Sequence, residues 1–211
     1  MVCRLDWMHV VDLGVAQDWL GQVFVYLLPK MNGESIDAQV ADLWSRIQLG
    51  YGAHPPVARL DTLTVNMLSP TGASPKLKCY AVEGRSIIPI ATDLCRALLN
   101  PEDPLEQAVA TAMEALNGCY ECLSSTEVAT HKLPDTSCRF ASLYVALADR
   151  CPPFRIKPKL HLFQELCEED LGADPSKEWT YQDEDFGGSL ASLAKEEVEP
   201  GLQRHKDCKS S

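Results

Sequence analysis

Residues 1–28 read MVCRLDWMHVVDLGVAQDWLGQVFVYLL, and a change of pattern within this stretch sets the expected fold. The first five residues are mainly apolar and predict a short strand. From Asp12 to Leu28 the apolar residues recur at three- to four-residue spacing, which predicts a helix. Asp12 is expected to cap the start of this helix, and Pro29 is expected to end it.

Asp6 and His9 lie between the expected strand and the expected helix. A carboxylate at the end of a strand, with an imidazole three residues later, is a common way to present a metal-binding acid at the edge of a sheet. A second acidic cluster, WTYQDEDF at residues 179–186, follows far downstream. Because Mg²⁺ prefers carboxylate oxygens, the two segments together predict one metal site divided between the two ends of the chain.

The rest of the chain is expected to be mainly helical. Residues 60–68 fit both a strand and a helix, and residues 78–99 predict one or two helices interrupted near Pro89. Gly50 and Gly52 are expected to end the helix before them. Helical spacing predicts helices over residues 36–49, 105–123, 137–149, 159–169 and 183–197.

Composition limits the function classes. The chain has 211 residues, enough for one domain or one domain with an insertion, and its formal charge is −11. This acidic balance argues against a general nucleic-acid binder, because the phosphate backbone attracts clustered Lys and Arg, but it leaves room for a local DNA contact. The nine cysteines predict reduced, buried side chains in an intracellular protein, and no apolar run predicts a membrane span.

The segment DWMH at residues 6–9 is followed by Leu13-Gly14 and Leu20-Gly21. This series resembles the region around the second catalytic Asp of RNase H-like, DDE-type DNA transposases, which include the hAT and CACTA superfamilies. The resemblance implies that Asp6 is a catalytic, metal-binding acid. It also implies that His9 orients the site without binding the metal itself.

A later series, KPKLHL at residues 157–162 and then WTYQDEDF at residues 179–186, resembles the end of the CACTA transposase domain. The resemblance implies that Glu184 is the third metal-binding acid. Asp183 and Asp185 compete with Glu184 for this role, and Asp185 stands where the family pattern has a basic residue.

The resemblance implies a mainly α fold with a partial RNase H-like α/β core of few short strands, interrupted by a helical insertion. The 177 residues between Asp6 and Glu184 fit such an insertion. The complete site would bind Mg²⁺ or Mn²⁺ and cleave and transfer DNA strands, and the family is expected in the nucleus. The expected parts are a core segment with the second acid (residues 1–35), the insertion (36–150), a core segment with the third acid (151–198) and a disordered tail (199–211).

The first catalytic Asp and its strands are not found in the sequence. We therefore expect a transposase-derived fragment that is inactive alone and binds DNA weakly or not at all. The sequence leaves self-association of the fragment open. The alternative is a helical protein–protein interaction module without catalysis, which would use the helices between residues 36 and 150. In that case Asp6 only caps a helix or ends a strand, His9 is a core histidine and Glu184 decorates a solvated first turn.

Two further clusters each have two interpretations. Arg155, Lys157 and Lys159, next to His161, form a basic patch that would contact a DNA phosphate; a solvated face that balances nearby acids is the favoured interpretation. Another cluster has zinc-ligand spacing, although buried structural cysteines are favoured there. Its members are Cys119, Cys122, His131 and Cys138.

Overall fold

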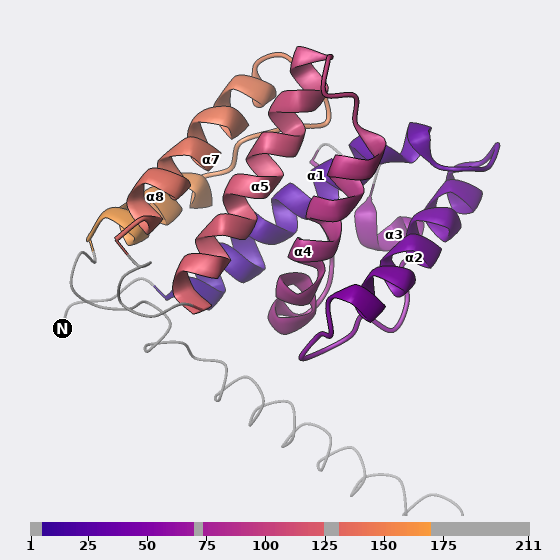
Figure 1. Cartoon of the computed structure of the whole chain (residues 1–211), viewed down its shortest axis with the longest axis horizontal. Helices are drawn as coiled ribbons and strands as arrows, with labels where there is room; N and C mark the ends of the chain where they lie inside the picture. Colours follow the sequence, from indigo (N-terminus) through magenta and orange to yellow (C-terminus); the bar gives the residue numbers. More distant parts are fainter. Residues whose placement is uncertain (1–5, 70–73, 125–130, 170–211) are drawn as a thin grey trace, which may run out of the picture. The chain divides into compact units, whose positions relative to one another are not determined.

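The computed structural model describes residues 6–69, 74–124 and 131–169 (Figure 1). The described residues are mainly helical and none of them lies in a strand, which confirms the mainly α class. All of them belong to one compact unit, Met1–Glu178, whereas the unit Trp179–Ser211 lies outside the described residues. The elements are η1 (Met8–Ala16), α1 (Gln17–Leu27), η2 (Leu28–Lys30), α2 (Ile36–Ala53), α3 (Val65–Leu68), α4 (Ala81–Leu98), α5 (Pro104–Ser124), α7 (Leu133–Ala148) and α8 (Lys159–Glu169).

Helices η1 and α1 follow one another without a break, and we refer to Met8–Leu27 as the central rod. Its residues are buried on nearly all sides, and it contacts α4 and α8. The predicted start at Asp12 is wrong, because Asp12 lies within the rod and is only 1% exposed. A helix that is buried on nearly all sides has no solvent-facing stripe of polar residues to mark where it begins.

Helices α5 and α7 lie side by side and form the most extensive helix pair among the described residues, with α8 packed on α7 (Figure 1). The core between this pair and the central rod is aromatic. The ring of Trp19 contacts those of Phe140, Tyr144 and Phe154 at centroid distances of 5.3, 4.9 and 5.1 Å. Its indole N–H points to the sulfur of Met113 at 3.3 Å.

Helix α2 continues through Gly50 and Gly52, which were expected to end it. A Cβ on Gly50 would lie 2.5 Å from Ile90 of α4, so a residue without a side chain is needed where the two helices approach each other. Helix α4 is a single helix with Pro89 inside it. Here tertiary packing overrides the local signals for a break.

The remaining bounds agree with the predicted ones more closely. The ambiguous residues 60–68 contain the short helix α3, and α7 begins at Leu133, one turn before the predicted start. Helices α5 and α8 lie where they were predicted. The predicted strand at residues 1–5, the predicted helix at 183–197 and the expected tail lie outside the described residues.

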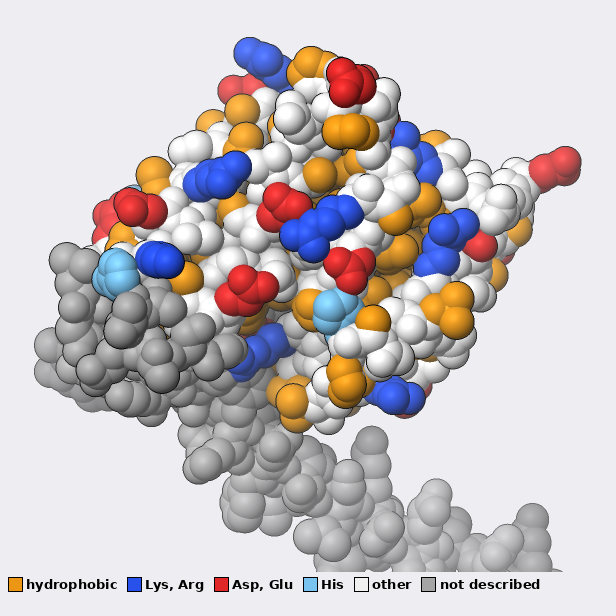
Figure 2. Space-filling model, in the orientation of Figure 1, with side chains coloured by type: hydrophobic (Ala, Val, Ile, Leu, Met, Phe, Trp, Pro, Cys, Tyr) orange, Lys and Arg blue, Asp and Glu red, His pale blue; other side chains and the backbone are white. Residues whose placement is uncertain are grey.

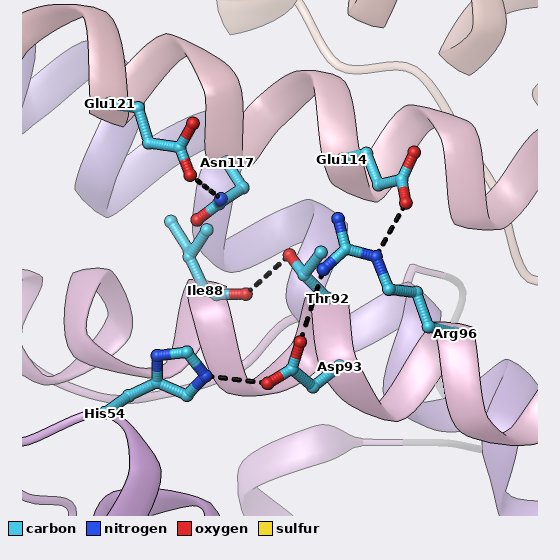
Figure 3. A network of polar contacts seen from close by, with 8 residues as sticks. All are labelled: His54, Ile88, Thr92, Asp93, Arg96, Glu114, Asn117 and Glu121. Atoms are coloured by element: carbon cyan, nitrogen blue, oxygen red, sulfur yellow. Dashed lines mark hydrogen bonds and ion pairs between the residues drawn. The ribbon is translucent and has the colours of Figure 1, made fainter.

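A chain of polar side chains joins α2, α4 and α5 at the surface (Figure 3). His54 at the end of α2 contacts Asp93 (2.7 Å), which accepts a hydrogen bond from Arg96 (3.3 Å). Arg96 also donates to Glu114 of α5 at 2.7 Å. Acidic and basic side chains are likewise interspersed over the face shown in Figure 2.

Candidate functional site at the start of the central rod

Asp6 caps the first helix. Its carboxylate accepts a hydrogen bond from the backbone N–H of His9 (3.0 Å), and its backbone carbonyl accepts one from Val10 (3.0 Å). A carboxylate at this position satisfies a helix N–H and faces the positive end of the helix dipole. Asp6 therefore has the capping role considered in the simpler alternative, and its metal role stays a prediction.

The imidazole of His9 lies beside the same carboxylate. Its Nδ1 is 2.5 Å from Oδ2 of Asp6, and its side chain is 63% exposed. The alternative in which His9 is a core histidine is therefore wrong. A ring held against one carboxylate oxygen at the surface restricts the orientation of that carboxylate, and the role of His9 in supporting a metal site stays a prediction.

Helix η1 is a π-helix of nine residues, Met8–Ala16. π-Helical segments longer than a single turn are rare, and single π-helical turns occur frequently at functional sites. Two lysines from distant segments donate to its backbone carbonyls: Lys159 to His9 (2.6 Å) and Lys76 to Leu13 (2.8 Å). A Cβ on Gly14 would lie 2.3 Å from Cδ of Lys159, so this glycine leaves the space through which the lysine crosses the helix.

The second motif region of the sequence meets the first one here. Lys159, the first residue of α8, is 150 positions from His9 in the chain and contacts its carbonyl. The rings of Trp7 and Phe163 lie edge to face with centroids 6.1 Å apart. KPKLHL at residues 157–162 thus begins a helix that packs against the helix of DWMH.

The basic patch is more closely tied to the protein than a solvated face would be. The ammonium of Lys157 lies 2.7 Å from the buried carboxylate of Asp18. Arg155 is exposed, and its backbone N–H and carbonyl bond the side chain of Gln22 at 3.0 and 3.2 Å. The side chains of Lys157 and Lys159 therefore have structural roles, whereas Arg155 is bonded through its backbone. DNA contact stays a prediction for all three basic residues.

The sequence analysis missed three buried polar side chains of the central rod and wrongly interpreted a fourth, Asp12, as a helix cap. Asp12 accepts a hydrogen bond from the hydroxyl of Tyr120. The guanidinium carbon of Arg85 lies over the ring of Tyr120, 5.6 Å from its centroid. Gln17 donates to the carbonyl of Cys79 at 2.6 Å. The available signal was the presence of polar residues inside an otherwise apolar run, since buried polar groups need partners. These residues are Asp12, Gln17, Asp18 and Gln22.

Glu184 and its competitors Asp183 and Asp185 lie outside the described residues, so the structure does not test whether they approach Asp6. Within residues 6–69, 74–124 and 131–169, no three His, Cys, Asp or Glu side chains form a group suited to a metal ion. The donor chemistry of Asp6 fits Mg²⁺ or Mn²⁺, but one carboxylate is only part of such a site. The metal stays a prediction.

The cysteines of the zinc alternative separate into different environments. Cys119 and Cys122 are buried on α5, and Cys138 is exposed on α7. Burial raises the pKa of the Cys119 thiol well above its usual value. Burial also raises the pKa of the Cys122 thiol. Thiols in such surroundings stay protonated at neutral pH and behave as small apolar side chains.

The surface also has a groove of about 350 Å³ between the segment before α3 and the start of α4. Its lining includes Leu60, Met67, Cys79 and Glu83, and neither Asp6 nor His9 belongs to it. Burial raises the pKa of the Cys79 thiol to about 12, so it is not a ready nucleophile. The groove adds no catalytic group to the candidate site.

No protein-family model, curated protein or solved structure matches this chain. Among the described residues, no helix combines the length and apolar character that crossing a membrane requires.

Proposed function

We propose that this chain is part of a DDE-type DNA transposase domain with an RNase H-like core, in which Asp6 and Glu184 are two of the metal-binding acids. The supporting observation is the contact between the two segments that carry the resemblance, where Lys159 donates to the carbonyl of His9 at 2.6 Å. Helices α2 to α7 separate these segments along the chain. A chain that leaves a helix and returns to the same helix has the path expected of a helical insertion within one core.

The chemistry would depend on positioning and charge neutralisation. Two bound Mg²⁺ or Mn²⁺ ions would stabilise the attacking and leaving oxygens of a phosphodiester. Asp6 would offer a carboxylate fixed by its bond to the His9 backbone, and the ring of His9 would limit its rotation. A carboxylate held in this way loses little conformational freedom when it binds a metal.

A titration with Mn²⁺ followed by NMR tests the shared site in this chain, because the paramagnetic ion broadens signals near it even when binding is weak. The imidazole signals of His9 should broaden first in the wild-type protein. Glu184→Gln should weaken this broadening, although residue 184 is far from His9 in sequence. Asp37→Asn, which alters an exposed acid on α2, is the matched control. Equal broadening in Glu184→Gln and the control would contradict the shared site.

Catalysis is tested in a longer protein that supplies the first acid. Asp6→Asn keeps a good capping side chain and removes the carboxylate, so it should preserve stability and abolish strand cleavage. Glu184→Gln should also abolish cleavage. Cleavage at the wild-type rate in either variant would refute the assignment.

The second candidate function, a helical protein–protein interaction module without catalysis, is favoured by exposed apolar side chains. Leu49, Val57 and Tyr80 are 79%, 94% and 71% exposed. Such residues are normal when scattered and mark interfaces when contiguous. If they mediate self-association, sedimentation of the wild-type chain should depend on concentration, and replacing all three by Ser should remove that dependence.

A further inference from the structure

Three lysines follow one side of the central rod. Lys159, Lys76 and Lys157 place their ammonium groups on the His9 carbonyl, the Leu13 carbonyl and the Asp18 carboxylate, at 2.6, 2.8 and 2.7 Å. The three acceptors are four and five residues apart, which is about one helical turn each.

The ammonium groups have donors to spare. Each ammonium group carries three N–H donors, and one acceptor in the described part of the chain bonds to each group. All three side chains are half-buried and reachable from solvent; that of Lys157 is 34% exposed. Asp18 offsets one of the three positive charges, so the row is locally cationic within a chain of formal charge −11.

The row is also electrostatically crowded. Burial lowers the pKa of Lys76; the carboxylate of Asp18 opposes this effect, and Lys159 and Lys157 add to it. Like charges held together in a partly desolvated place favour a counter-ion, because an anion relieves both the desolvation and the repulsion. A ligand that carries several negative charges along its length suits three ammonium groups held near one another.

We infer that Lys76, Lys157 and Lys159 form a binding row for successive phosphates of a DNA strand laid across their ammonium groups at the surface. The choice of ligand rests on the proposed function, whereas the geometry of the row does not. The row differs from the basic patch predicted from sequence: Lys76, which belongs to no motif, replaces Arg155. One end of the row lies at His9, so the bound strand would pass the Asp6 carboxylate.

Binding of a fluorescent 20-nucleotide single strand by the 211-residue chain, measured over a series of salt concentrations in EDTA, tests the row. Lys76→Met and Lys159→Met should each lower the affinity and reduce the slope of log K against log salt by about 0.7, the value for one phosphate contact on a single strand. Lys157 is tested in the pair Asp18→Asn/Lys157→Met, because removing the lysine alone leaves a buried charge.

Two controls separate charge from structure. Lys132→Met removes an exposed lysine before α7 and should leave affinity and slope unchanged. Lys76→Arg keeps the charge and should keep the slope. If Lys76→Met binds as Lys132→Met does, or if the wild-type chain does not bind the strand, the row is refuted.

This outcome is independent of the metal chemistry, since EDTA removes divalent ions. Lysine-dependent binding together with cleavage that survives Asp6→Asn would overturn the proposed catalytic acids and leave the row standing. Loss of cleavage in Asp6→Asn together with lysine-independent binding would do the reverse.

Discussion

The central rod and helix α2 show two ways in which a helix is held in this protein. Helix α2 buries one stripe, Val40, Leu43, Ile47 and Tyr51, and leaves the rest of its surface to solvent. The rod is buried on nearly every side, with polar side chains enclosed among apolar ones. A one-sided helix depends on a single apolar contact surface, whereas an enclosed helix needs a partner for each polar group that it carries inside.

This difference appears in where the contacts come from. Asp42 and Gln39 of α2 also bond to residues outside their own helix. These partners, Asn32 and Gly33, lie in the turn just before α2. In the rod, the partner of Gln22 is Arg155 and that of Asp12 is Tyr120, both more than 100 residues away. We therefore expect substitutions in the rod to affect the whole domain, and those in α2 to have smaller and more local effects.

Trp19→Ala should give the largest effect, because it opens a cavity lined by three aromatic rings. The expected loss in the free energy of unfolding is about 3–5 kcal/mol. Urea denaturation followed by circular dichroism measures it, and Leu49→Ala on the exposed side of α2 is the control, expected within about 0.5 kcal/mol of wild type. A cost for Trp19→Ala no larger than that of the control would remove the contrast between the two helices.

Gln22→Leu should come next, since it removes the acceptor of the Arg155 backbone N–H and one of the two acceptors of the Tyr144 hydroxyl. The Arg155 carbonyl loses the Gln22 amide and keeps its bond from Tyr144. A buried group left without a partner costs about 1–3 kcal/mol, so the variant is expected to lose about 2 kcal/mol. Gln39→Leu makes the same chemical change at a half-buried position of α2 and should leave the free energy of unfolding nearly unchanged. Similar losses in both variants would show that the enclosed amide is not the source of the effect.

Ser35→Ala should give the smallest effect. The hydroxyl of Ser35 accepts a hydrogen bond from the N–H of Ala38 at 3.2 Å and caps α2. Loss of such a cap typically costs about 1 kcal/mol. A shift of the urea midpoint with an unchanged m-value would measure it, and Ser35→Asp should restore the wild-type midpoint. A loss in Ser35→Ala as large as that of Gln22→Leu would contradict the ranking of the two helices.

The sequence predicted what depends on local patterns. Helices with one apolar stripe, such as α5 and α8, were found within about a residue of their ends because burial on one side leaves a periodic signal. The proximity of Asp6 and His9 also follows locally, since residues three apart meet at a helix start. The start of the rod was misplaced, because a helix buried on nearly all sides gives no such one-sided signal.

The rest of the candidate site is non-local. Nothing in the sequence near Lys76 indicates that it reaches the carbonyl of Leu13, and nothing near Gly14 indicates that Lys159 crosses it. Asp18 reads as an ordinary polar residue of a helix, yet it is buried against Lys157. Such contacts depend on the packing of α4 and α8 on the rod, which brings together segments that no local pattern connects.

By itself, the sequence of this protein determined its helical class, most helix positions and the residues that invite a metal hypothesis, because side-chain periodicity and residue chemistry are properties of short segments. Only the tertiary structure decided that Asp12, Gly50 and Pro89 lie inside helices, and that three lysines contact the central rod. The physical reason is that packing energy, shared among many distant residues, outweighs the smaller local preferences of a single glycine, proline or carboxylate.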